Sequence, residues 1–70
     1  MKLSARNQLR GVVTKINEGA AIGNVELDVS GQRLVASITV EAIHELGLSE
    51  GSEVTAVIKA SDVMLAVSGD

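Results

Sequence analysis

Alternation of apolar and polar side chains with a period of two constrains the fold of this chain most. Val25, Leu27 and Val29 alternate with Glu26 and Asp28. This pattern is typical of a β-strand with one buried and one solvated face. Segments rich in β-branched residues or with similar alternation predict four more strands, at residues 9–16, 33–38, 54–58 and 63–67.

Between the third and fourth predicted strands, the apolar spacing changes. Val40, Ile43 and Leu46 recur at intervals of three and form one face of a short predicted helix. Thr39 is a favourable N-cap residue, and Gly47 is typical of a C-terminal glycine cap. The predicted order is therefore β-β-β-α-β-β, which is that of a mostly β, five-stranded Greek-key barrel of the OB type.

The chain lacks the usual means of stabilising a small domain. Its 70 residues favour one domain, residues 1–70, and contain no Phe, Trp, Tyr or Cys. Neither large aromatic side chains nor disulfides can contribute, and a single histidine makes a structural zinc site implausible. Small scaffolds without these supports commonly oligomerise. We therefore expect a homo-oligomer whose subunits share a core.

Charge is distributed unevenly along the chain. Four of the six Lys and Arg residues lie within residues 1–17, which contain no acid, although the net charge is −3. A nucleic-acid partner is disfavoured because it would need a broad basic face, and the missing aromatics also disfavour an oligonucleotide-binding OB domain. No apolar run is long enough for a membrane span, and no signal peptide is visible, so we expect a cytoplasmic protein without a membrane partner.

The sequence contains no pattern typical of an enzyme. A nucleophile needs a base nearby, and the only histidine, His44, falls on the predicted helix. Glu41 and Glu45 are interpreted as a solvated helix face. The glycines have no phosphate-loop spacing. No catalytic residue is therefore predicted.

Two short clusters bring hydrogen-bond donors together without carboxylates. Each combines a cation, a small residue and a hydroxyl: Ser4, Ala5 and Arg6 form the N-terminal cluster, and Lys59, Ala60 and Ser61 form the C-terminal cluster. A tetrahedral dianion offers acceptors only, so its site needs hydroxyls, N–H groups and cations. Thr39 adds a hydroxyl where a helix start leaves backbone N–H groups free. We hypothesise that these residues bind a small oxyanion.

The same residues also permit an ordinary surface interpretation. Ser4 could cap a turn, and Asn7 and Gln8 could form one. Arg6 and Lys59 could be solvated surface cations. The Ser-x-Arg spacing does not by itself separate the two interpretations.

Three motifs resemble one known family. The segments SARNQLRG at 4–11, ELGLSEG at 45–51 and AVIKASDVM at 56–64 together resemble the molbindins. These are small cytoplasmic molybdate-binding proteins built from one Mop domain, which is akin to the molybdate-sensing part of a transcriptional regulator. The resemblance covers about residues 2–67.

The resemblance implies an OB-like fold, with strand-exchanged dimers that assemble as a trimer of dimers into a hexamer. It also implies oxyanion sites between subunits, with the N-terminal cluster of one chain meeting the C-terminal cluster of another. Thr39 matches a hydroxyl position of relatives, whereas some relatives have a further hydroxyl where this chain has Ala42. The resemblance also implies that oxyanions can bind at threefold axes of the assembly.

The function implied by the resemblance is storage and buffering of molybdate, with tungstate bound similarly. The metal would keep its oxo shell, so no protein atom would coordinate molybdenum and no cofactor is expected. The alternative is an oligomeric sensing or interaction module that docks on a molybdate transporter or regulator. That module would bind the anion only incidentally.

Overall fold

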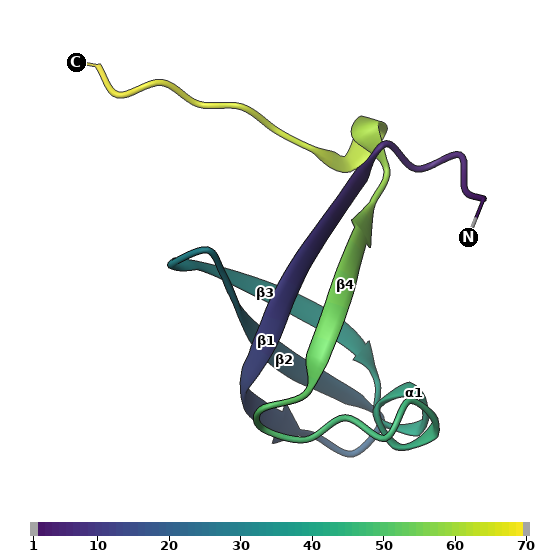
Figure 1. Cartoon of the computed structure of the whole chain (residues 1–70). Helices are drawn as coiled ribbons and strands as arrows, with labels where there is room; N and C mark the ends of the chain where they lie inside the picture. The colour runs from purple at the N-terminus through teal and green to yellow at the C-terminus, as the bar shows by residue number, and fades with distance from the viewer. Residues whose placement is uncertain (1, 70) are drawn as a thin grey trace.

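The computed structural model describes residues 2–69 as a four-stranded antiparallel sheet with one short helix (Figure 1). The strand order in the sheet is β3-β2-β1-β4. A mostly β fold with one helix between the third and fourth strands is therefore confirmed. The elements are β1 (Asn7–Glu18), β2 (Ile22–Val29), β3 (Gln32–Thr39), α1 (Val40–Glu45), β4 (Glu53–Ile58) and the 3-10 turn η1 (Ala60–Asp62).

The first strand, β1, pairs with two different neighbours along its length. Residues 7–12 pair with β4, and residues 12–18 pair with β2. The register with β2 shifts between Val13 and Lys15, which leaves Thr14 as the extra residue of a β-bulge. Bulges bend a strand and increase its twist. The bend helps β1 pass from one partner to the other.

Gly11 lies where β1 changes partners. A Cβ atom at Gly11 would lie 2.8 Å from the carbonyl oxygen of Asp28 and 2.9 Å from Cγ2 of Val29. Glycine within a strand often marks such a close backbone approach. The absence of a side chain at Gly11 therefore lets β1 cross close to β2.

The short helix has both of its predicted ends. The hydroxyl oxygen of Thr39 accepts a hydrogen bond from the Ala42 N–H at 3.0 Å, which caps the first turn. Gly47 has a positive φ of 63°, and its N–H donates to the carbonyl of His44 at 3.1 Å. A second bond, from the Leu48 N–H to the Ile43 carbonyl, completes a Schellman motif.

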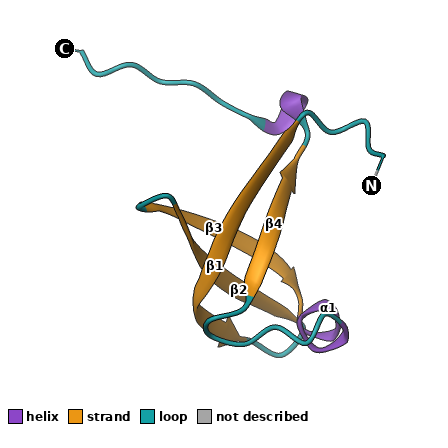
Figure 2. Cartoon of the chain, viewed as in Figure 1, coloured by secondary structure: helices purple, strands orange, loops and turns teal. Residues whose placement is uncertain are grey.

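The core is small and aliphatic. Its buried members are Val13, Val25, Leu27 and Ile43. Ile43 projects from α1, which lies at one end of the sheet (Figure 2). This small set of buried side chains reflects a sequence without Phe, Trp or Tyr. Among residues 2–69, no helix is long and apolar enough to cross a membrane.

Two details of the predicted strands are wrong. The first strand begins at Asn7 rather than at residue 9, so Asn7 and Gln8 are strand residues and not turn formers. The fifth strand, predicted at 63–67, does not form in this chain. The apolar side chains of this segment, which we call the tail, are largely exposed, with Met64, Leu65 and Val67 at 92–93%.

The tail leaves the sheet because η1 turns the chain away after β4. The Asp62 N–H donates to the Lys59 carbonyl at 2.9 Å, and the Val63 N–H donates to the Ala60 carbonyl at 3.2 Å. Figure 1 shows the chain running outward beyond this turn. A short apolar run such as residues 63–67 predicts an extended segment, but a strand also needs a neighbouring backbone to pair with. Residues 2–69 therefore form four strands instead of five.

Substitution of Gly11 tests the close approach of β1 and β2. The Gly11→Ala variant should lose about 1–3 kcal/mol of unfolding free energy, because its Cβ atom overlaps a backbone carbonyl that cannot move independently. Urea denaturation measures the loss. Gly69→Ala is the matched control, since a Cβ atom there meets nothing within 4 Å. Equal stability of the two variants would contradict the proposed crossing.

Candidate oxyanion-binding site

The two donor clusters lie at the same end of the sheet. The pairing of β1 with β4 begins at Asn7 and Ile58, which are register partners. Arg6 and Lys59 are the next residues outward along the two strands. Figure 1 shows the N-terminal segment and η1 close together at this end. The fold thus places the ends of the two strands next to the clusters side by side within one chain. The meeting of clusters from different chains, which the resemblance implies, stays a prediction.

The cluster side chains are accessible. Ser4, Arg6 and all three residues of the C-terminal cluster are exposed, whereas Ala5 is half-buried. Lys59 is the N-cap residue of η1, and Ala60 and Ser61 lie within the turn. The small residue of each cluster leaves room for a ligand near the backbone. This end of the sheet therefore presents cations, hydroxyls and backbone groups together.

The cations of the clusters are not engaged in the ion pairs found among residues 2–69. One of these pairs joins Arg33 Nε to Glu26 Oε1 at 2.8 Å, and the other joins His44 Nε2 to Glu18 Oε1 at 3.0 Å. The Arg33 hydrogen bond lowers the pKa of Glu26, and the positive charge of Arg33 adds to this effect. Both pairs lie on other parts of the fold. Arg6 and Lys59 can therefore direct their charge at an external anion.

Thr39 lies at the other end of β1. It is paired with Ile22, and residues 17–18 at the end of β1 pair with the start of the same strand, β2. A strand rises roughly 3.3 Å per residue, and β1 has 12 residues. The structure therefore does not bring Thr39 to the donor clusters of its own chain. An ion that contacted both donor clusters and a Thr39 hydroxyl would need that Thr39 to come from a second chain.

The potential catalytic side chains show no catalytic arrangement. His44 is exposed and contacts Glu18 across the surface. Glu41 and Glu45 are exposed on the same helix, as the interpretation of a solvated face requires. Within the described part of the chain, no group of three or more His, Cys, Asp or Glu residues could hold a metal ion.

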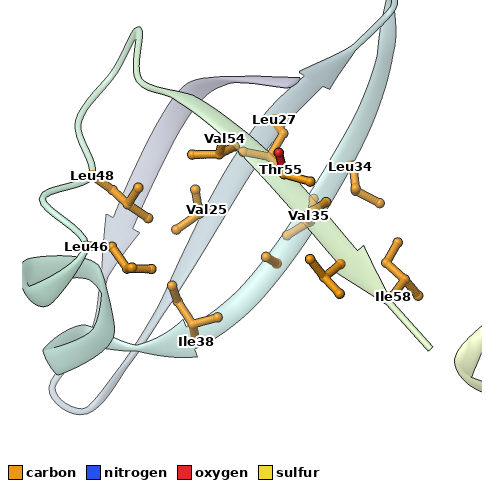
Figure 3. Close-up of a pocket in the computed structure, with 13 residues that line it drawn as sticks. Val25, Leu27, Leu34, Val35, Ile38, Leu46, Leu48, Val54, Thr55 and Ile58 are labelled. Atoms are coloured by element: carbon orange, nitrogen blue, oxygen red, sulfur yellow. The ribbon is translucent and has the colours of Figure 1, made fainter. Parts of the chain in front are cut away.

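Sequence reasoning missed an apolar groove of about 290 Å³ beside β4 (Figure 3). Its walls come from β2, β3, β4 and the segment after α1, and they include Leu34, Ile38, Leu48, Val54 and Ile58. The apolar alternation of the strands indicated inward faces, and the lack of aromatic side chains and cysteines favoured subunits that share a core. Neither signal could locate the gap, because the gap depends on how far apart β3 and β4 lie.

Comparison with known proteins identifies the family. Residues 3–65 match the TOBE domain. Molybdenum-pterin-binding protein 1 of Clostridium pasteurianum is 44% identical over 66 residues, which cover 93% of this chain and 97% of that protein. The matched relative is a binding protein of similar length. The prediction of a binding protein rather than an enzyme is therefore confirmed.

Solved structures show the same fold. A molybdate-binding protein from Sporomusa ovata has a TM-score of 0.92 at 36% identity, covering 96% of this chain and 100% of that one. The cytoplasmic molybdate-binding protein ModG, with molybdate bound, has a TM-score of 0.91 at 45% identity over 97% of this chain and 49% of that one. The chain belongs to the TOBE/Mop-domain family of molybdate-binding proteins, the molbindins.

Proposed function

We propose that this protein binds, stores and buffers molybdate in the cytoplasm, and that it binds tungstate similarly. The observation that carries the proposal is the pair of donor clusters at one end of the sheet, which contain two cations and two hydroxyls and no carboxylate. A doubly charged oxyanion is a ligand made only of acceptors, so this composition suits it. Membership of the molbindin family supports the choice of molybdate among such anions.

Each group has a distinct role in the proposed site. Arg6 and Lys59 supply positive charge, and Arg6 can also donate two parallel hydrogen bonds. Ser4 and Ser61 donate hydroxyl hydrogen bonds, while backbone N–H groups around Ala5 and Ala60 complete the shell. Molybdenum keeps its own oxygen atoms, so the protein recognises the oxyanion and does not coordinate the metal.

We place a second chain at the site. Thr39 cannot reach the clusters of its own chain, so a Thr39 hydroxyl would have to come from a neighbouring subunit. A rigid pocket between subunits would select by size, because sulfate has the same charge and shape as molybdate. Such a site couples ion binding to assembly, since the ion interacts with groups from both chains.

The tail and the groove support exchange of a strand between two copies. The tail is apolar and extended, its Met64, Leu65 and Val67 side chains are almost fully exposed, and it has no strand partner among residues 2–69. The groove is lined almost entirely by aliphatic side chains and lies beside β4, an edge strand. A tail from a second copy would fill the groove and add the fifth strand.

This exchange would give the complete architecture. We propose that residues 1–70 form a single Mop domain, whose OB-like Greek-key barrel of five strands closes only in the strand-exchanged dimer. Three such dimers would form the hexamer. The thin core supports this assembly, because a chain with so few buried side chains gains much by sharing apolar surface.

Native mass spectrometry tests the proposed function directly. The protein should run as a hexamer that gains several molybdate-sized mass increments, with similar increments from tungstate and none from sulfate. An assembly that is indifferent to molybdate would overturn the storage function. If a transporter or regulator subunit were then captured in a molybdate-dependent manner, the interaction-module alternative would replace it.

Replacement of Arg6 tests the placement of the site. The Arg6→Ala variant should lose about 1.5–3 kcal/mol of molybdate binding free energy, because the dianion loses a charged donor. Isothermal titration calorimetry measures the affinity. Arg10→Ala is the matched control, since it removes the same charge from an exposed position four residues further along the chain, on β1. Equal affinities of the two variants would show that the site lies elsewhere.

Removal of the tail tests the strand exchange. A chain that ends after Asp62 should lose the dimer and the hexamer, because the groove is left without an occupant. Leu65→Asp should weaken assembly for the same reason, and Ser68→Asp should not, since Ser68 follows the apolar segment. Analytical ultracentrifugation measures the assembly state. A truncated chain that remains hexameric would exclude the tail as the exchanged strand.

A further inference from the structure

Asn7 connects the two donor clusters. It directly follows Arg6, and its side-chain Nδ2 donates a hydrogen bond to the carbonyl oxygen of Ile58 at 3.2 Å. Ile58 directly precedes Lys59. The bond therefore joins the residue after one cluster to the residue before the other, 51 positions apart in the chain.

Because a peptide group is planar, this hydrogen bond also affects the orientation of the C-terminal cluster. The carbonyl of Ile58 and the N–H of Lys59 belong to one planar unit. When the Asn7 amide holds that carbonyl, it also fixes the direction in which Lys59 leaves the strand. The Lys59 carbonyl then accepts from the Asp62 N–H at 2.9 Å, so the turn with Ala60 and Ser61 begins at the tethered peptide.

The surroundings of Asn7 suit a fixed contact. Asn7 is half-buried, whereas its neighbours Arg6 and Gln8 are exposed. Neighbouring residues of a strand point to opposite faces, so Gln8 cannot make the same contact. Among residues 2–69, the Asn7 bond is the side-chain hydrogen bond that joins the two residues adjacent to the donor clusters, and none involves a cluster residue itself.

We propose that Asn7 is a positioning residue for the oxyanion site. It does not contact the ion. Its side chain holds the Ile58–Lys59 peptide so that the C-terminal cluster faces Arg6 before the ion arrives. Preorganised donors bind more tightly than mobile ones, because less conformational freedom is lost on binding. This role rests on the proposed function, since it concerns the geometry of the same molybdate site.

Asn7→Ala and Gln8→Ala form the matched pair for the test. In the ligand-free protein, Asn7→Ala should speed hydrogen exchange of the Asp62 and Val63 amides, the two donors of η1, while amides in the β1–β2 ladder keep their rates. Its dissociation constant for molybdate should rise about fivefold, which corresponds to the loss of one net hydrogen bond. Gln8→Ala should change neither quantity. A residue that only stabilised the fold would change exchange throughout the sheet.

Two results would overturn the role of Asn7: unchanged exchange at Asp62 and Val63, or an unchanged dissociation constant. Asn7→Asp keeps the size of the side chain and removes the donor, so it provides the exchange measurement if Asn7→Ala does not assemble. Weak binding by Arg6→Ala together with normal binding by Asn7→Ala overturns the role of Asn7 alone. A wild-type protein that takes up no molybdate overturns the proposed function as well.

Discussion

The backbone pairing of β1 with two different strands is the interaction on which the rest of this structure depends. Residues 7–12 of β1 pair with β4, and residues 12–18 pair with β2. Gly11 permits the change of partner, and the bulge near Thr14 provides further bending. Because β4 is held by the first half of β1, its last residue lies beside the beginning of the chain. The proximity of the two donor clusters is a direct result of this register.

Much of the fold could be predicted because it depends on local patterns. Alternation located β2 and β3, and the change of spacing at Val40 located the helix together with its caps. The predicted fifth strand failed because strand formation depends on a distant partner, which no local pattern reveals. The site likewise has one part that local sequence predicts and one part that it does not. The residue types of the clusters indicated an oxyanion, but their proximity and the separation of Thr39 depend on register.

The same scarcity of large side chains links the fold to its proposed assembly. Among residues 2–69, the buried hydrophobic core has four members, and an apolar groove stays open beside β4. Residues 3–65 nevertheless match the family model along nearly the whole chain. A chain with an open apolar groove therefore belongs to a family of binding proteins. A second copy of the chain is the proposed source of the apolar surface that would cover this groove.

The hydroxyl that caps α1 has a consequence for what can approach that end of the molecule. The oxygen of Thr39 already accepts a hydrogen bond from the Ala42 N–H, which occupies part of its lone-pair density. A hydroxyl carries one proton, and that proton points away from an incoming donor. The cap therefore leaves the single O–H donor of Thr39 unused, because the hydroxyl acts only as an acceptor in this hydrogen bond. An electron-rich atom that reaches this end of the molecule can accept a hydrogen bond from this hydroxyl without disturbing the helix cap.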